Sequence, residues 1–319
     1  MTVLSSLADL VTPMAIRVAA TLRIADHIAA GVTTAPALAE RVKADPDALG
    51  RLLRHLVTRG VLADDGAGGF ALTATGEELR DDELRGRLDM DGPLGRADIS
   101  LVHLTHAVRT GTAAFPVLYG RQFWDDLSAD PERTAEYATL MGVDVADWAP
   151  SIVDGFDWAS LGQVVDVGGG NGTLLTAILQ AHPDLRGTVV DLAGPVEEAR
   201  ATFADAGLAD RAGAVVGSFF EPLPVTGAGG YLLCAITHDW DDDSARTILR
   251  RCAEAAGPDG RVFVVEKSAS PDTRMDLLML TYFGARERGL PELAALAESA
   301  GLRVVAVHPA GDTPIVELR

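Results

Sequence analysis

The chain has 319 residues, 48% of them hydrophobic, and a formal net charge of −19. That apolar fraction excludes a disordered chain, and at ~100–200 residues per domain the length suggests two domains or one large one. A chain this acidic repels phosphate backbones and anionic lipid, so we expect neither nucleic acid nor membrane as a partner. The sequence contains only two cysteines, Cys234 and Cys252, so we expect no disulfides. It shows neither a basic leader nor an apolar span of ~20 residues, and we therefore expect a cytoplasmic protein.

Residues 1–100 are expected to form a helical domain. Apolar residues recur at helical spacing over 7–31, and Asp45 or Pro46 opens a further helix. Residues 61–73 then have the form of a short hairpin. Helices followed by a two-stranded wing are typical of a winged helix, so a DNA-binding regulator is an alternative, which the acidic charge of the chain disfavours.

Residues 101–155 are expected to form a helical linker that contributes to a substrate pocket. From 156 to 319, short β-rich runs alternate with helical runs, which predicts a mostly parallel sheet with helices on both faces. The predicted strands cover 163–167, 187–192, 212–218, 230–236, 260–266, 302–309 and 313–319. Only a tight turn separates the last two strands, so we expect them to form an antiparallel hairpin.

The strongest local motif is DVGGGNG, in which a buried strand meets a glycine-rich turn and then a helix. The dinucleotide fingerprint G-x-G-x-x-G does not fit in any register. The spacing is instead acidic-x-G-x-G-x-G, from Asp166 through Gly168, Gly170 and Gly172. It resembles motif I of class I S-adenosylmethionine (SAM) methyltransferases, although a glycine-rich loop can also be a simple tight turn.

Polar and aromatic residues follow the next strands at the edge where ligands bind in open α/β sheets. Asp191 ends the second strand, where its carboxylate can accept two ribose hydroxyls or merely cap the following helix. After the third strand, Ser218 is placed to bond an adenine edge and Phe219 to stack on its face. His238 lies just past the fourth strand, in the run THDW.

Four motifs in order, DVGGGNG, GSFFEPLP, THDWDDDSARTILRRCAEAAGPDGR and MDLLMLTYFGARER, make the whole chain resemble SAM-dependent small-molecule O-methyltransferases of the caffeic-acid type. Within them it is most similar to the bacterial aromatic polyketide branch, which includes a naphthoic acid O-methyltransferase of enediyne pathways. The resemblance implies an α/β class I methyltransferase domain over 156–319, with a Rossmann-like sheet and an antiparallel last strand. It also implies an N-terminal winged-helix-like dimerisation domain, a homodimer, SAM as cofactor with S-adenosylhomocysteine as product, and no metal.

The resemblance also assigns the chemistry. His238 matches the family's general base, which removes the proton of a phenol, and Glu266 and Glu287 are expected to orient its imidazole. Asp239 is interpreted as support for the loop. The acidic run Asp239–Asp243 is better explained by Asp243 or Ser244 capping the next helix than by a magnesium site.

Two sets of binding residues follow. The cofactor residues are expected to be Asp166, Gly168, Gly170, Asp191, Ser218, Phe219, Cys234, Trp240, Met141 and Arg133, although the family often has Asp in place of Ser218 and Lys or Ser in place of Cys234. The acceptor residues are expected to be Arg17, Tyr137, Met275, Met279, Tyr282 and Phe283. A plain core stripe remains open for the last four, and a structural ion pair for Arg17.

The predicted function is O-methylation of a phenolic hydroxyl on an aromatic natural-product intermediate, such as a hydroxynaphthoic acid. The alternative within the family is a relative that keeps SAM but performs hydroxylation or decarboxylation.

Overall fold

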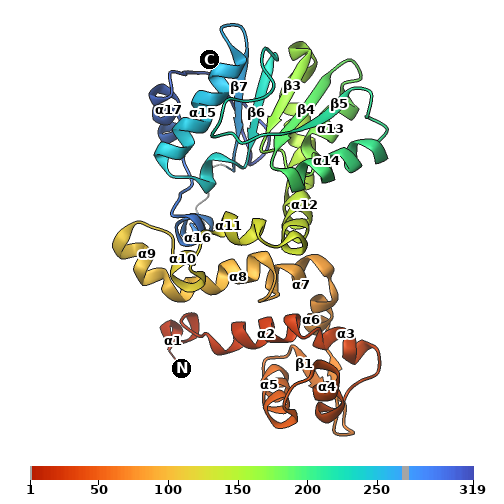
Figure 1. Ribbon diagram of the computed structural model, residues 1–319. Helices are drawn as coiled ribbons and strands as arrows, with labels where there is room; N and C mark the ends of the chain where they lie inside the picture. Colours follow the sequence, from red (N-terminus) through yellow and green to blue (C-terminus); the bar gives the residue numbers. More distant parts are fainter. Residues whose placement is uncertain (1, 268–272) are drawn as a thin grey trace. The chain divides into compact units, whose positions relative to one another are not determined.

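The computed structural model describes residues 2–267 and 273–319, which form two compact units, Met1–Ile99 and Ser100–Arg319 (Figure 1). Residues 101–155, the segment that the sequence suggests as a linker, are mostly helical and belong to the second unit. Their helices are α9 (Leu104–Thr110), α10 (Phe115–Tyr119), α11 (Phe123–Ser128) and α12 (Pro131–Gly155).

The first unit is helical with one small hairpin. Its elements are α1 (Val3–Leu7), α2 (Val11–Thr21), α3 (Ile24–Ala29), α4 (Ala35–Val42), α5 (Pro46–Thr58), β1 (Leu62–Asp64), β2 (Phe70–Leu72), α6 (Ala74–Glu77), α7 (Asp82–Leu88) and α8 (Pro93–Ile99). The Asp45 carboxylate accepts the backbone N–H of Ala48 at 2.8 Å and so caps α5, as the sequence predicts. Strands β1 and β2 pair antiparallel and form the predicted hairpin after α5. Leu53 and Leu56 of α5 lie in the core of this unit.

The helical run expected over 7–31 is interrupted twice. The Asp9 carboxylate accepts the N–H groups of Val11 and Thr12 at the start of α2, and Arg23, at φ 50°, separates α2 from α3. By length and composition alone, the segment Val3–Thr21 qualifies as a membrane span, which corrects the expectation that no stretch does. Core helices and signal sequences pass the same test, and this segment is divided between α1 and α2.

The second unit is built on a seven-stranded sheet of order β5-β4-β3-β6-β7-β9-β8. The strands are β3 (Gln163–Val167), β4 (Arg186–Asp191), β5 (Ala212–Val216), β6 (Gly230–Cys234), β7 (Arg261–Val265), β8 (Val304–His308) and β9 (Ile315–Leu318). Strands β3 to β7 run parallel, whereas β9 pairs antiparallel with both β7 and β8. The mostly parallel sheet and its closing antiparallel hairpin are therefore confirmed.

Helices cover both faces of this sheet (Figure 1). On one face, α12, α13 (Thr173–Ala181) and α14 (Ala193–Asp205) share a core with Trp158 and Phe263. On the other face, α15 (Asp242–Ala256) and α17 (Leu290–Ser299) pack around Tyr231 and Val264. Because both faces are covered, the central strands are apolar runs, and each buried large side chain contributes roughly 1.5–3 kcal/mol.

The sheet reverses its winding between β3 and β6, which are neighbours in space but not consecutive in the chain. In open α/β sheets such a reversal leaves a crevice at the carboxyl ends of the two strands. Helices α11, α12 and α16 (Arg274–Phe283) of the same unit lie beyond that edge in Figure 1, and α16 contacts the 3-10 turn Thr237–Asp239 that follows β6. The candidate site is therefore bounded by strand ends on one side and helices on the other.

One capping prediction is wrong. Helix α15 begins at Asp242, and the residue that caps it is Asp241, whose carboxylate accepts the N–H of Ser244 at 2.8 Å. Neither Asp243 nor Ser244 is the cap, because both already lie within the first turn of the helix. Their side chains still interact favourably with the positive, N-terminal end of the helix dipole.

Candidate active site

The glycine-rich loop between β3 and α13 requires glycine by its backbone. Gly168, Gly170 and Gly172 have φ values of 75°, 55° and 76°. A Cβ on Gly168 would lie 2.6 Å from Cδ1 of Ile236, and one on Gly172 would lie 2.8 Å from the ring of Phe203. The loop therefore combines a left-handed backbone with close packing, which only glycine allows, and leaves the start of α13 open to a ligand.

Asn171 fastens this loop in place, a role that the sequence motif alone did not indicate. Its Oδ1 accepts the backbone N–H of Thr173 at 3.2 Å and the Thr173 hydroxyl at 2.7 Å. Its Nδ2 donates to the carbonyl oxygen of Ala138 in α12 at 3.4 Å. The glycine-rich loop is thus tied to the helix that lies beyond the strand ends.

Two carboxylates lie beside this loop. Asp166 is 1% exposed, and within the described part of the chain neither of its oxygens has a hydrogen-bond partner. Burial, reinforced by the charge of Asp191, raises the pKa of Asp166 to about 7. A buried carboxylate without a donor is costly, so this position fits a cationic ligand group.

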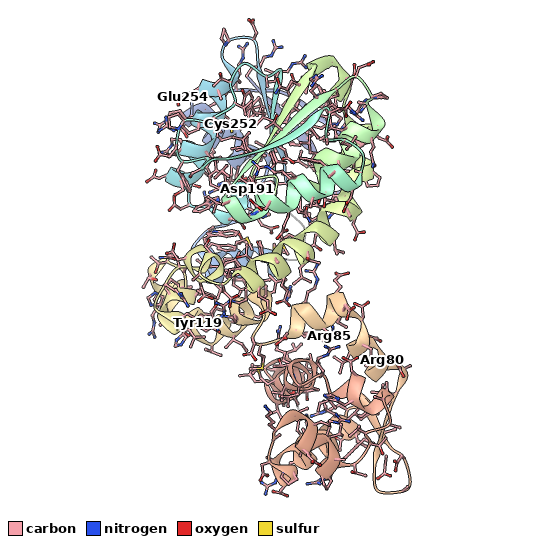
Figure 2. All side chains as sticks on the ribbon, turned by 45° about the vertical axis from the view of Figure 1, so that its right-hand side comes forward. Arg80, Arg85, Tyr119, Asp191, Cys252 and Glu254 are labelled. Atoms are coloured by element: carbon pink, nitrogen blue, oxygen red, sulfur yellow. The ribbon has the colours of Figure 1, made fainter. Side chains whose placement is uncertain are left out.

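Asp191 lies at the end of β4, at the lower edge of the sheet as drawn in Figure 2. Its Oδ2 accepts the Gly170 N–H at 2.9 Å, and its Oδ1 accepts the Leu192 N–H at 2.6 Å. Burial raises the pKa of Asp191, and these two hydrogen bonds oppose that shift. Since each carboxylate oxygen can accept a second hydrogen bond, the side chain can hold a vicinal diol from this position. Asp166, Asp191 and the glycine loop together fit a cationic nucleoside such as SAM.

The loops after β5 and β6 bring aromatic rings to the same edge. The ring of Phe219 lies 3.4 Å from the position of a Cβ on Gly168, and it meets Trp240 edge-on with ring centroids 5.7 Å apart. The Ser218 hydroxyl accepts the N–H of Phe220 at 3.2 Å and can still donate to a ligand. Burial, reinforced by the charges of Asp166 and Glu266, raises the pKa of the Cys234 thiol, so this side chain is a neutral thiol at the end of β6.

His238 lies in the turn that follows β6, and its side chain is 16% exposed. Ala235, two residues before the start of this turn, has a left-handed φ of 55° and donates its N–H to the carbonyl oxygen of Val265. This conformation is costly for a residue with a Cβ, and strained backbone of this kind gathers at functional sites. It re-aims the chain from the strand into the 3-10 turn.

The expected partners of the imidazole are arranged differently from the prediction. Glu266 is buried, but its Oε1 accepts the Thr237 hydroxyl at 2.6 Å and the backbone N–H of His238 at 3.0 Å. It thereby anchors the loop backbone instead of bonding the ring, since Glu266 directly follows the neighbouring strand β7 and meets the main chain of the turn. In the described part of the chain, the carboxylate in contact with the imidazole is that of Asp239, with Oδ1 3.4 Å from Nε2.

The charge of His238 affects the pKa values of two nearby carboxyl groups, those of Asp239 and Glu287. Burial raises the pKa of Asp239 to about 7; the charge of His238 opposes this shift and that of Glu266 adds to it. Burial also raises the pKa of Glu287, and the charge of His238 again opposes the shift. The backbone N–H of Glu287 donates to Asp276 Oδ1 at 3.0 Å.

A cluster of aromatic rings lies on the helices next to this site, and its centre, Trp124, was missed at the sequence level. The Trp124 ring is nearly parallel to that of Phe283, at 5.3 Å and 7°, and to that of Trp240, at 6.2 Å and 16°. Tyr137 meets it edge-on, and burial raises the pKa of the Tyr137 hydroxyl. Trp124 precedes the motifs that carry the resemblance, so only its place in the fold reveals it.

The other expected acceptor residues differ in burial. Met279 and Tyr282 are buried in α16, while Met275, one turn earlier, is 40% exposed. Met141 lies in α12 and is partly buried.

Two expected ligand-binding arginines are engaged in ion pairs. Arg133 lies 3.3 Å from the Asp130 carboxylate and 3.9 Å from that of Asp126. Arg17, in the first unit, pairs with Asp98 and donates to the carbonyl oxygen of Leu88. Arg17 thus forms the structural ion pair that was its alternative role. Among the described residues, no group of three or more His, Cys, Asp or Glu side chains could hold a metal ion.

Comparison with known proteins gives two family matches. Residues 4–81 match the O-methyltransferase dimerisation domain, and residues 101–303 match the O-methyltransferase domain. The chain is 55% identical to a 2,7-dihydroxy-5-methyl-1-naphthoate 7-O-methyltransferase of Streptomyces carzinostaticus, over 99% of this chain and 96% of that relative. It is 45% identical to the aclacinomycin 10-hydroxylase RdmB of Streptomyces purpurascens, over 98% of this chain and 87% of that one.

A solved structure agrees with these matches. The crystal structure of NcsB1, an O-methyltransferase from neocarzinostatin biosynthesis in complex with SAM and 2-hydroxy-5-methyl naphthoic acid, superposes with a TM-score of 0.95. It is 55% identical and covers 100% of this chain and 98% of its own. The expected fold class and cofactor are thereby confirmed. The chain belongs to the family of small-molecule O-methyltransferases with a dimerisation domain, and it is a SAM-dependent O-methyltransferase.

Proposed function

We propose that this enzyme methylates a phenolic hydroxyl of a hydroxynaphthoic acid or a closely similar polyketide-derived aromatic acid. The observation that carries the proposal is the position of His238, in the turn that follows β6, the strand next to β3, which leads into the glycine-rich loop. The names of the 55% identical relatives, which specify naphthoates, support this acceptor class. The near-parallel rings of Trp124, Phe283 and Trp240 also suit a flat, fused-ring acceptor.

His238 would act as the general base. Bound SAM supplies an electrophilic methyl group on a sulfonium. A phenol has a pKa near ~10 and is a poor nucleophile at neutral pH, whereas an imidazole with an ordinary pKa near ~6.5 can take its proton. Asp239 lies beside one ring nitrogen of His238, which leaves the other nitrogen to accept the phenolic proton.

The carboxylates around His238 would hold the turn and the ring in place. Asp239 Oδ1 lies 3.4 Å from Nε2 of the imidazole, and Glu266 holds the backbone of His238 through a charge-assisted hydrogen bond at 3.0 Å. Fixing the base in this way lowers the entropic cost of reaching the reactive geometry. Asp166 and Asp191 would hold the ammonium group and the ribose of SAM respectively, because one lacks a donor and the other has acceptor sites left.

The experiment is methyl transfer from labelled SAM to a panel of hydroxynaphthoic acids and the matching naphthols without a carboxyl group. We expect transfer to the acids, and a loss of ~10²-fold or more in kcat for His238→Ala with SAH affinity unchanged. His308→Gln, on the edge strand β8, is the control and should keep its activity. An equal loss of turnover and SAH binding in His238→Ala would contradict the assignment of the base.

Hydroxylation is the second candidate, because a 45% identical relative is a hydroxylase. The mass of the product separates the two activities, since methylation adds one CH₂ and hydroxylation adds one oxygen. We expect the gain of CH₂ alone.

We also infer that the enzyme is a homodimer in the cytoplasm. Residues 4–81 match a dimerisation domain, and Val3, Leu4 and Leu7 at its start are between 75% and 79% exposed in the isolated chain. Contiguous exposed apolar side chains of this kind are typical of an interface. Light scattering should give the mass of two chains for the wild type and of one chain for a Leu4→Glu, Leu7→Glu variant.

A further inference from the structure

Arg288 is a buried cation to which the proposed chemistry gives no role. It lies one residue after Glu287, and only 1% of its side chain is exposed. Taking a guanidinium out of water is costly unless its donors are satisfied. What its donors bond therefore indicates what the residue does.

The donors of Arg288 converge on the turn that carries His238. Nη1 donates to the carbonyl oxygen of Thr237 at 2.6 Å, and Nη2 donates to the carbonyl oxygen of Trp240 at 2.8 Å. Nε and Nη2 both donate to Oδ1 of Asp242, at 3.0 and 2.8 Å. The two carbonyl groups directly flank the dipeptide His238–Asp239, so the guanidinium spans both ends of the turn.

The same side chain joins two separate segments of the site. Thr237 to Asp242 follow β6, whereas Arg288 and Glu287 follow α16. A planar guanidinium with fixed donor directions can hold two carbonyl groups and a carboxylate at once, and an ammonium group cannot reproduce that geometry. The hydrogen bond from Arg288, assisted by its charge, also holds the pKa of Asp242 below its usual range, which keeps that partner ionised.

We propose that Arg288 is a positioning residue for methyl transfer: it fixes the turn with His238 and Asp239 relative to the segment with Glu287. The inference rests on the proposed role of His238 as the base. Displacing a catalytic group by about 1 Å can cost ~10²-fold in rate. We call the hydrogen bonds from Arg288 to Thr237, Trp240 and Asp242 the clamp. Loss of the clamp should therefore reduce turnover and leave the cofactor residues around the glycine-rich loop in place.

The chain offers a matched control. Arg286 also pairs with Asp242, at 3.1 Å, but its side chain is 55% exposed. Exposed ion pairs contribute little, so Arg286→Ala should keep nearly wild-type kcat. Comparing kcat of the Arg288 and Arg286 variants therefore distinguishes the effect of the clamp from the effect of any cation near Asp242.

The first test is the kinetics of Arg288→Lys and of the milder variant Asp242→Asn. We expect kcat to fall by ~10²-fold in Arg288→Lys and by a smaller factor in Asp242→Asn, with KM for SAM and the Kd for SAH within about twofold of wild type. A structural role alone would instead lower the unfolding temperature and weaken SAH binding together with kcat. That result would overturn the proposal.

The second test is the coupling between Arg288 and His238. If Arg288 acts through His238, Arg288→Lys should change the residual rate of His238→Gln by less than about twofold. If the double variant instead loses the product of the two single losses in kcat, the positioning role is refuted and the base assignment stays intact. Full activity of His238→Gln by itself would instead refute the base assignment and, with it, this inference.

The third test is chemical rescue. A cavity of about 300 Å³ borders the clamp and is lined in part by Asp241, Asp242, Asp276 and Arg288, which offers guanidinium ion a route to the space left in Arg288→Ala. Millimolar guanidinium should raise kcat of Arg288→Ala at least tenfold and leave His238→Ala unchanged. Equal stimulation of both variants, or of neither, would contradict the clamp.

Discussion

The Thr237 hydroxyl offers a sharp test of how the catalytic turn is held. It is fully buried and donates to Glu266 Oε1 at 2.6 Å, and Thr237→Val removes that donor with almost no change of shape. A buried hydrogen bond to a charged group contributes about 1.5–3 kcal/mol, because its loss leaves the carboxylate poorly solvated. Since Glu266 also accepts the N–H of His238, we expect kcat to fall about tenfold as well.

Thr281 supplies the control for this substitution. It is equally buried, but its hydroxyl donates at 2.7 Å to the carbonyl oxygen of Leu277 in its own helix, a neutral acceptor. Such a bond contributes about 1 kcal/mol. Thermal unfolding should therefore place Thr237→Val roughly 2–4 °C below Thr281→Val, taking ~1 kcal/mol of difference for a domain of this size. If the two variants unfold at the same temperature, the carboxylate is not held in the way described.

Three further predictions concern the cofactor side of the site. Asp191→Ala should weaken SAH binding by about 1–3 kcal/mol in calorimetry, through lost charge-assisted hydrogen bonds, and unchanged affinity would contradict the ribose contact. Because the pKa of Asp166 is raised to about 7 in the folded chain, the folded state binds the extra proton, so this group makes stability fall as pH rises from about 4 to 7. Asp166→Asn should flatten that part of the stability profile, and an unaltered slope would show that Asp166 is not the group responsible. Gly172→Ala should lose more stability than Gly207→Ala: both have a positive φ, which costs ~1–2 kcal/mol, but only the former places a Cβ against Phe203. Equal unfolding midpoints for the two alanine variants would show that the ring moves aside freely.

The sequence was informative where local chemistry decides the structure. The run 163–167 contains three valines between Gly162 and Gly168, and it forms β3 with those bounds. Asp191 and His238 were placed at the carboxyl edge because the first ends a strand and the second follows one, and the parallel sheet brings both there. Strand topology was thus sufficient to bring these two candidate residues to one edge of the sheet.

The sequence was less informative where the direction of a side chain decides which group it contacts. The choice between Glu266 and Asp239 as the neighbour of the imidazole depends on a 3-10 turn entered through a left-handed Ala235, which no sequence pattern predicts. Trp124 and Arg288 owe their places to contacts between segments far apart in the chain. Such contacts leave no periodicity for a pattern to reveal.

The adjacency of β3 and β6 has a consequence for how such enzymes diversify. The loop for the cofactor and the turn with the base extend from neighbouring strands of a sheet covered on both faces, so their separation is governed by the ~4.8 Å spacing of the backbone ladder. The side chains that we propose for the acceptor pocket come from helices outside that ladder, on α11, α12 and α16. Substitutions there can retune which molecule is accepted while the distance between donor and base stays constant, so one rigid frame can serve many natural-product pathways.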